Sequence, residues 1–443
     1  MNIKLSDHFT YKKLFRFTLS PIIMMVFTSI YGVVDGFFVS NYVGKNSFAA
    51  INLIMPFLMI IGGMGFMVGT GGSALTAKTL GEGDNKRANA YFTMMVKFTV
   101  ILGITLSVFG IVFIRPIAHF LGADSEMIGE CIVYGRVILV FNIAFMLQNV
   151  FQSFLVTAEK PRLGLVATVA AGVTNMVLDA LFIAGFKWGV AGAAAATGIS
   201  QVVGGILPLI YFLKPNNSLL RLTSAKLKAK PLLSACANGS SELMSNISSS
   251  LVSMLYNFQL MRLAGKNGVA TFGVLMYVQF IFIAISIGYA IGSAPIISYH
   301  YGAKNHDELK NMLRRSTVLM SISGIVLMLA AQLLAAPLAH IFVGYDAELL
   351  QMTTQAFRCF AFSFVLSGMN IFASSFFTAL NNGGISAAIS FLRTLIFQTL
   401  SIIILPICFG INGIWWANTS AEIFAFVISL IFIIANRKKY NYI

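Results

Sequence analysis

The segment GKNSFA at residues 44–49 returns in the second half of the chain as GKNGVA at residues 265–270. The shift in numbering that carries Gly44 onto Gly265 also aligns Gly81 with Gly302, residues 116–119 with residues 337–340, and residues 149–158 with residues 370–379. One shift that serves several widely separated blocks indicates an internal duplication. The duplicated unit is far longer than the roughly 20 to 50 residues of a solenoid repeat, so each copy is a structural half of the protein.

Both halves are strongly hydrophobic. Of the 443 residues, 58% are hydrophobic and only 10% are charged, and the mean hydropathy is +0.84. Such a composition excludes a soluble globular protein and a disordered one. A helix crosses the hydrocarbon core of a membrane with about 20 apolar residues. Twelve apolar runs reach that length, centred near Phe27, Ile61, Gly103, Ala144, Thr174, Gln201, Ser249, Phe282, Ile325, Val365, Ile396 and Phe426.

The net charge of +15 first suggests a nucleic-acid partner, but its distribution argues against one. Most of the 30 lysines and arginines lie in alternate loops, in the N-terminal segment and at the C-terminus. The opposite loops hold few basic residues, of which Lys45, Lys187 and Lys266 are the clearest. This is the positive-inside pattern of a multi-pass membrane protein, and it predicts that both termini are cytoplasmic. No nucleic-acid partner is expected.

The predicted fold is an all-α integral membrane protein of twelve transmembrane helices in two six-helix lobes. Because six is an even number, both halves enter the membrane in the same direction, so a pseudo-two-fold axis along the membrane normal relates them. We expect an N-lobe at residues 1–213, a basic cytoplasmic linker at 214–231 and a C-lobe at 232–443. Duplicated hydrophobic halves are typical of secondary transporters.

Glycines are dense in the second apolar run, where Gly65 and Gly69 show the spacing that lets membrane helices pack closely. This run follows no predicted strand, and the chain has no Gly-Lys-Ser or Gly-Lys-Thr sequence of a phosphate-binding loop. We therefore expect no ATP-driven motor. Transport would draw on an ion gradient or be passive.

Four carboxylates lie deepest in the apolar runs: Asp35, Asp179, Glu242 and Glu422. A charged group at the centre of a membrane costs roughly 2.5–3.5 kcal/mol on insertion scales, so each of them requires a reason. The basic residues within runs lie nearer the ends, where snorkelling to the interface is the simpler explanation; they are Lys97, Arg136, Arg358 and Arg393. For Glu422, a purely structural role in the last helix is an equal alternative.

The two halves do not share their acidic residues. At the repeat shift Tyr256 replaces Asp35, and Glu242 stands where the first half has Pro21. A carboxylate needed only for folding would be expected in both halves, so the asymmetry favours function. Asp179 follows Asn175 by one helical turn, which places both on one helical face. Two neighbouring carboxyl groups in a low-dielectric site can share a proton, or hold a desolvated Na⁺ when ionised.

These residues resemble the signatures of the multidrug and toxic compound extrusion (MATE) transporters. The first is Pro21 followed by YGVVDGFFV at residues 31–39. The second is NMVLD at 175–179, followed by GVAGAA at 189–194 and by Thr197. The resemblance extends over essentially the whole chain. It implies an exporter that rocks between two orientations and exchanges amphipathic cations for H⁺ or Na⁺.

The resemblance also implies a coupling-ion site in the N-lobe. Its residues here would be Asp35, Tyr134, Asn175, Asp179 and Thr197, of which Tyr134 rests on its position in the fourth run. Asp35, Asn175, Asp179 and Thr197 are the candidate Na⁺ ligands. Some members of the family use a second, acidic pair in the C-lobe. Glu242 and Tyr256 are secondary candidates there, but the tenth run offers Asn370 in place of an acid. This departure favours coupling in the N-lobe.

The sequence thus predicts a multidrug efflux antiporter of the plasma membrane, with a role in antibiotic resistance. We expect it to be monomeric, to contact membrane lipids and to need no cofactor besides the coupling ion. The main alternative is a flippase or exporter of lipid-linked saccharides or of an endogenous metabolite. An anionic lipid head would need several cationic residues in the cavity, whereas the deepest charges are acidic. No metalloprotease or aspartate-rich motif is visible, so an enzyme is not expected. A passive channel is not expected either.

Overall fold

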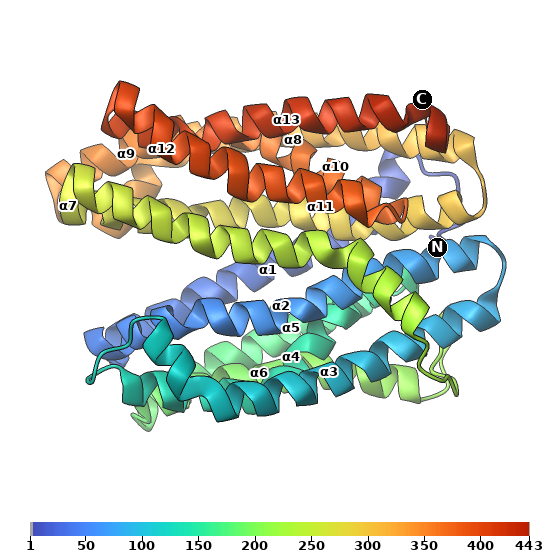
Figure 1. Ribbon diagram of the computed structural model, residues 1–443, viewed down its shortest axis with the longest axis horizontal. Helices are drawn as coiled ribbons and strands as arrows, with labels where there is room; N and C mark the ends of the chain where they lie inside the picture. The colour runs from blue at the N-terminus through green and yellow to red at the C-terminus, as the bar shows by residue number, and fades with distance from the viewer. Residues whose placement is uncertain (1–2, 443) are drawn as a thin grey trace.

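The computed structural model describes residues 3–442, and these residues form helices joined by short connections, without a strand. Figure 1 shows two bundles of long helices lying side by side. The first bundle contains α1 Tyr11–Tyr42, α2 Lys45–Gly81, α3 Asn85–Phe120, α4 Ile128–Thr157, α5 Pro161–Asp179 with the π-helical turn η1 Ala180–Gly185, and α6 Gly189–Leu213. The second contains α7 Ala229–Gly302, α8 His306–Val343, α9 Ala347–Ala361, α10 Phe364–Ala379, α11 Gly383–Phe391, the π-helical turn η2 Leu392–Phe397, α12 Gln398–Phe409 and α13 Ile411–Tyr440.

The twelve predicted spans are confirmed, although some of the helices are broken or joined. The long helix α7 contains two spans, because its backbone leaves the helical region at Gly265 (φ 59°, ψ −147°). In contrast, α9 and α10 together make one span that bends by 47°. The segment 383–409 makes one span in which η2 widens the helix between α11 and α12. Each lobe therefore contains six spans.

The internal duplication is visible in the turns. Gly44 and Gly265, which are equivalent in the repeat, both have positive φ (110° and 59°). Gly189 and Gly410 repeat this relation with φ values of 60° and 58°. Positive φ is easily reached only by glycine, which explains why the duplicated sequence keeps glycine at both pairs of positions. The turn at Gly265 separates the two spans of α7 at the place where Gly44 separates α1 from α2.

The two lobes meet through glycines. A Cβ placed on Gly71 of α2 would lie 1.9 Å from the carbonyl oxygen of Ala235, and one placed on Gly239 would lie 1.9 Å from the carbonyl oxygen of Met67. Nearer one end, a Cβ on Gly81 would lie 1.9 Å from the Tyr299 carbonyl oxygen. Such distances mean that the α2 and α7 backbones touch, which only glycine allows.

The contacts between the lobes follow the pseudo-two-fold axis. A Cβ on Gly302 would lie 1.9 Å from the Lys78 carbonyl oxygen. In the repeat, Gly302 is equivalent to Gly81 and Lys78 is equivalent to Tyr299, so this contact is the symmetry equivalent of the one just described. Likewise, Gly292 of α7 packs against Thr18 of α1. This contact is the symmetry equivalent of the contact between Gly71 and Gly239. The inter-lobe surface was therefore duplicated together with the helices that form it.

The segment between Leu213 and Ala229 connects the lobes without forming a helix, and much of it is bound to α3. Leu220 is fully buried. The Arg221 amide donates to Asn89 Oδ1 at 2.8 Å, and the Thr223 amide donates to Thr93 Oγ1 at 2.9 Å. The connection is thus fastened to the N-lobe along most of its length. The last of these bonds to the N-lobe runs from Lys97 Nζ to the carbonyl oxygen of Ala225 at 3.0 Å, close to the start of α7.

The N-terminal segment bridges the two lobes at the end where both termini lie (Figure 1). The Leu5 amide donates to Glu159 Oε1 of the N-lobe at 2.6 Å. A short distance along the chain, the Phe9 amide donates to Glu308 Oε1 of the C-lobe at 2.9 Å. Glu308 also lies 2.6 Å from His8 Nδ1 and accepts from Asn311 Nδ2 at 2.7 Å. Leu5 and Phe9 are fully buried beneath these bonds.

Replacing Glu308 by glutamine is expected to destabilise this bridge. Glutamine keeps the shape of the side chain but loses the charge that holds three donors, and hydrogen bonds to a charged group contribute about 1.5–3 kcal/mol each. We expect a lower melting temperature of the purified protein. Glu348→Gln is the matched control, because Glu348 is also in the first turn of a helix but is exposed. Equal melting temperatures for the two variants would show that the bridge contributes no stability.

Candidate functional site

The predicted N-lobe residues come together inside the first bundle. Asp179 is the last residue of α5, directly before the π-helical turn η1, and its side chain is fully buried. Asn175 lies one turn earlier and is also buried. Asp35 of α1 is half-buried, and Asp179, Thr197 and Asn175 are the side chains that approach its carboxyl group. Short π-helical turns are frequent at functional sites because they change the direction of the side chains next to them.

The polar atoms of this cluster lack fixed partners. Asp35 Oδ1, both carboxylate oxygens of Asp179, both polar atoms of the Asn175 amide and Thr197 Oγ1 are buried, yet no protein group completes a hydrogen bond of ordinary geometry to any of them. Buried polar atoms are normally satisfied, and leaving one unpaired costs about 1–3 kcal/mol. Four adjacent side chains in this condition are better suited to binding a ligand than to stabilising the fold.

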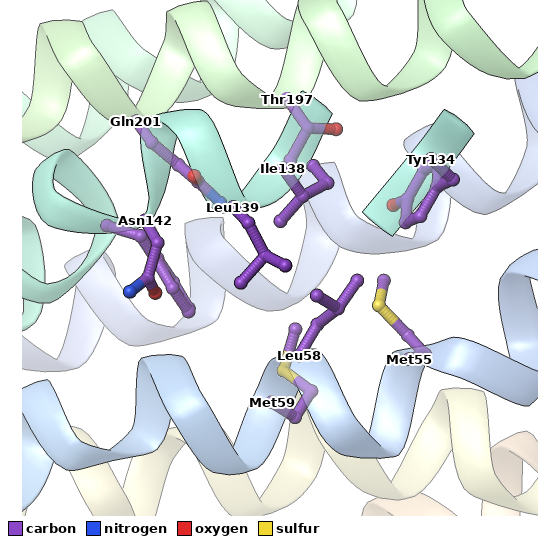
Figure 2. A pocket seen from close by; sticks show the side chains of 10 residues that line it. Met55, Leu58, Met59, Tyr134, Ile138, Leu139, Asn142, Thr197 and Gln201 are labelled. Carbon is purple, nitrogen blue, oxygen red and sulfur yellow. The ribbon is translucent and has the colours of Figure 1, made fainter. Parts of the chain in front are cut away.

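A cavity of about 20 Å³ adjoins the cluster and is lined by residues of α2, α4 and α6. In Figure 2, Asn142 and Gln201 lie at one end and Tyr134 lies at the other, with Thr197 on the α6 side. Met55 and Met59 cover the α2 side. The cavity has room for about one water molecule, so in this conformation it admits a small ion or water but no drug-sized compound. Thr197 belongs to both the cavity and the carboxylate cluster.

Tyr134, predicted from its position alone, is buried at 2% exposure and lines this cavity. It makes no hydrogen bond to the carboxylates, but the charges of Asp35 and Asp179 both act on its hydroxyl group. Tyr277 of the C-lobe is a residue that the sequence analysis missed. Its hydroxyl lies 3.5 Å from where a Cβ on Gly36 would be, beside Asp35. The glycine after Asp35 signals a close approach by another helix, but the identity of that helix is visible only in three dimensions.

The secondary candidates lie in the C-lobe and do not join this cluster. Tyr256 is buried, stacks on Phe272 at 4.5 Å and donates to Gln398 Oε1 at 3.3 Å. Asn370 Nδ2 donates to Glu422 Oε2 at 2.6 Å. Glu242 is half-buried on α7.

The expectation that Arg393 snorkels to the membrane interface is wrong. Its guanidinium group is paired with Glu422, with Nη2 at 2.7 Å from Oε1 and Nε at 3.0 Å from each carboxylate oxygen. The side chain of Arg393 is 15% exposed and that of Glu422 is 3% exposed. A buried carboxylate on a neighbouring helix is a stronger attraction for the guanidinium group than the distant interface. This partner is not visible in a linear sequence.

The chemistry of the N-lobe cluster is that of a small cation site. Two carboxylates, an amide and a hydroxyl group supply oxygen ligands, which suit a shared proton or a hard cation such as Na⁺. Within residues 3–442 no three histidine, cysteine, aspartate or glutamate side chains are close enough to hold a transition metal. A helical membrane protein with two duplicated lobes and a buried pair of carboxylates in one of them has the architecture of a secondary transporter.

The comparisons place the chain within that class. The model of the MatE family matches residues 21–181 and, again, residues 243–404, one match in each lobe. The chain therefore belongs to the MATE family of multi-pass membrane transporters. Two similar relatives are the multidrug export protein MepA of Staphylococcus saprophyticus and that of Staphylococcus aureus strain MSSA476, both 24% identical. Each alignment covers 93% of this chain and 91% of the relative.

Solved structures agree on the fold. A MATE protein in complex with MaL6 superimposes with a TM-score of 0.91 at 24% identity, over 97% of this chain and 98% of that one. An outward-facing multidrug resistance MATE transporter gives a TM-score of 0.92 at 23% identity, over 98% of each chain. At these identities the likeness establishes the architecture of twelve helices in two lobes.

Proposed function

We propose that the protein is a cation-coupled multidrug efflux antiporter whose coupling ion, H⁺ or Na⁺, binds at Asp35 and Asp179. The observation that carries the proposal is the set of unpaired buried atoms shared by Asp35, Asn175, Asp179 and Thr197. Two carboxylates that approach each other in a buried site repel unless a proton or a cation lies between them. The occupied and the empty site therefore have very different energies, which is the requirement for an ion-driven switch.

Coupling follows from competition for the same negative charge. A cationic substrate bound close to the cluster and a small cation at Asp35 would each weaken the binding of the other, and thermodynamic linkage makes this effect reciprocal. The competition acts either directly through charge or through a bend of α1 near Asp35. Tyr277 reaches toward α1 from the C-lobe, so a change in α1 beside Asp35 would be transmitted to the contact between the lobes.

The substrate class is inferred from the relatives and from the walls of the site. The staphylococcal relatives are multidrug export proteins. Methionine and aromatic side chains such as Met55, Met59 and Phe145 line the N-lobe cavity. Methionine adapts to ligands of varied shape, and aromatic faces attract organic cations. Because the cavity inside the N-lobe holds only about one water molecule as it stands, a drug-sized compound can enter only after the helices that line it have moved apart.

We further propose that the protein resides in the plasma membrane with both termini in the cytoplasm, as the positive-inside pattern indicates. The glycine contacts between the lobes and the bridging N-terminal segment would then close the cytoplasmic side. A lipid-linked saccharide is a less suitable substrate. Arg393, a largely buried cation of the C-lobe, is already paired with Glu422 and is not available to an anionic lipid head.

Transport in proteoliposomes tests the proposal. The purified protein would be reconstituted, and the movement of ethidium, a fluorescent organic cation, would be followed under an imposed pH gradient and, separately, under a Na⁺ gradient. We expect one of the two gradients to drive ethidium against its own gradient. If folded protein transports no ethidium under either gradient, multidrug antiport is wrong, and a flippase becomes the function to pursue.

A further inference from the structure

The polar cluster of the C-lobe is the symmetry counterpart of the N-lobe site. At the repeat shift Asp35 corresponds to Tyr256 and Thr197 to Asn418, and Gln201 of the adjoining cavity corresponds to Glu422. Asn175 and Asp179 correspond to the apolar Ile396 and Leu400. In the C-lobe all three of the polar groups have hydrogen-bond partners. Tyr256 donates to Gln398, and Gln398 Nε2 donates to Asn418 Oδ1. The duplication thus produced two polar centres in equivalent positions, and only the N-lobe centre keeps its atoms unpaired.

Glu422 is the one carboxylate of this C-lobe centre, and its oxygens are fully engaged. Arg393 binds both of them, and Asn370 Nδ2 adds a bond of 2.6 Å to Oε2. Asn370 is itself held by Ser429, whose hydroxyl donates to Asn370 Oδ1 at 3.3 Å. A bidentate arginine–carboxylate pair in a buried site is strong and has a fixed geometry. No oxygen of Glu422 is left for another cation.

We propose that Arg393 is a built-in cation that neutralises Glu422 in the C-lobe counterpart of the cavity beside the coupling site and thereby confines ion coupling to the N-lobe. In this role Arg393 determines specificity: it prevents H⁺, Na⁺ and cationic substrates from using Glu422. The inference rests on the proposed function, because it presupposes that the N-lobe cluster is the coupling site.

The position of Arg393 supports this assignment. It lies in the π-helical turn η2, and its side chain is 15% exposed, so the space that it fills is not sealed from its surroundings. The charge of Arg393 also reaches Glu242, the other deep acid of the C-lobe. Removing the guanidinium group would leave Glu422 buried without a counter-charge, which is strongly unfavourable unless a proton or a small cation replaces it.

The test uses the full-length protein with its N-lobe site silenced by Asp35→Asn and Asp179→Asn. In this background Arg393→Met removes the built-in cation, and Arg393→Met with Glu422→Gln removes both charges as the matched control. The binding of radioactive sodium would be measured, together with the melting temperature in NaCl and in N-methylglucamine chloride at the same ionic strength. We expect Arg393→Met alone to gain sodium binding, or a rise of several degrees in melting temperature on adding Na⁺ or on acidification. The parent and the double-neutral protein should show neither gain.

A second measurement covers the case in which Arg393→Met is too unstable to purify. Arg393→Ala would be purified with millimolar guanidinium ion, which can occupy the place of the missing side chain. We expect guanidinium to raise the melting temperature of this variant and not that of Arg393→Ala with Glu422→Gln. The proposal is overturned if removal of Arg393 creates no response to any of these cations, or if the parent already shows a response that depends on Glu422. These experiments measure cation binding and melting temperature but not transport. Their outcomes therefore do not depend on whether the wild type is an antiporter.

Discussion

Replacing Asp35 by asparagine is expected to abolish ion-driven export while leaving the fold intact. Asparagine has the same shape and forms hydrogen bonds, but it cannot take up a proton at physiological pH and attracts a cation only weakly. The repulsion between Asp35 and Asp179 disappears, so the energy difference between the empty and the occupied site becomes much smaller. Ion binding can then no longer drive the change in orientation of the lobes. Ethidium accumulation should therefore fall to the level of protein-free liposomes.

The control for this variant is Asp307→Asn. Asp307 is exposed in the first turn of α8, far along the chain from the carboxylate cluster, and its charge is not expected to affect transport. Both variants should have melting temperatures close to that of the wild type, because the Asp35 Oδ1 atom has no hydrogen bond to lose. An Asp35→Asn protein that still couples ethidium export to a gradient would remove Asp35 from the mechanism.

Replacing Gly71 by alanine is expected to have the second large effect. The added Cβ would lie 1.9 Å from the carbonyl oxygen of Ala235 and 2.6 Å from the amide of Gly239, so α2 and α7 would have to move apart. Overpacking a close contact typically costs about 1–3 kcal/mol. Because this crossing joins the two lobes, the cost falls on the conformation in which the lobes touch. An alternating-access cycle must pass through that conformation, so export should be largely lost.

Gly273→Ala is the matched control, since Gly273 lies in α7 and a Cβ there would meet nothing within 4 Å. Alanine is the better helix former by about 1 kcal/mol, so this control should be at least as stable as the wild type. Melting temperature and ethidium transport would be measured for both variants. Wild-type transport by Gly71→Ala would show that the backbone contact between the lobes is dispensable.

Hydropathy and the repeat predicted most of the fold. Twelve apolar runs gave the twelve spans, and the match of Gly44 with Gly265 marked the break that divides α7. The small residues of the second run indicated close packing, and Gly71 is one of them. Gly65 and Gly69 pack against α4 of the same lobe, whereas Gly71 faces α7 of the other lobe, and the sequence did not reveal this difference. A run of small residues shows that some helix approaches closely, but not which one.

The candidate site was predictable in part. Asp35 and Asp179 stand out because a carboxylate at membrane depth is costly, and the spacing of Asn175 and Asp179 places them on one face. The polar contacts of the C-lobe were harder to predict from the sequence. Arg393 was misinterpreted because its partner Glu422 lies 29 positions away on another helix. Membrane depth can be estimated from a linear sequence, whereas the direction in which a side chain points depends on packing.

The central claim is that Asp35 and Asp179 bind the coupling ion in competition with a cationic substrate. Equilibrium binding of ethidium to the purified protein, measured across pH and across Na⁺ concentration at constant ionic strength, tests it most directly. We predict that ethidium affinity falls as H⁺ or Na⁺ increases, by up to about tenfold per pH unit for one competing proton. This dependence should vanish in the Asp35→Asn, Asp179→Asn double variant. An ethidium affinity that responds to neither ion in the wild type, or a dependence that survives in the double variant, would contradict the account.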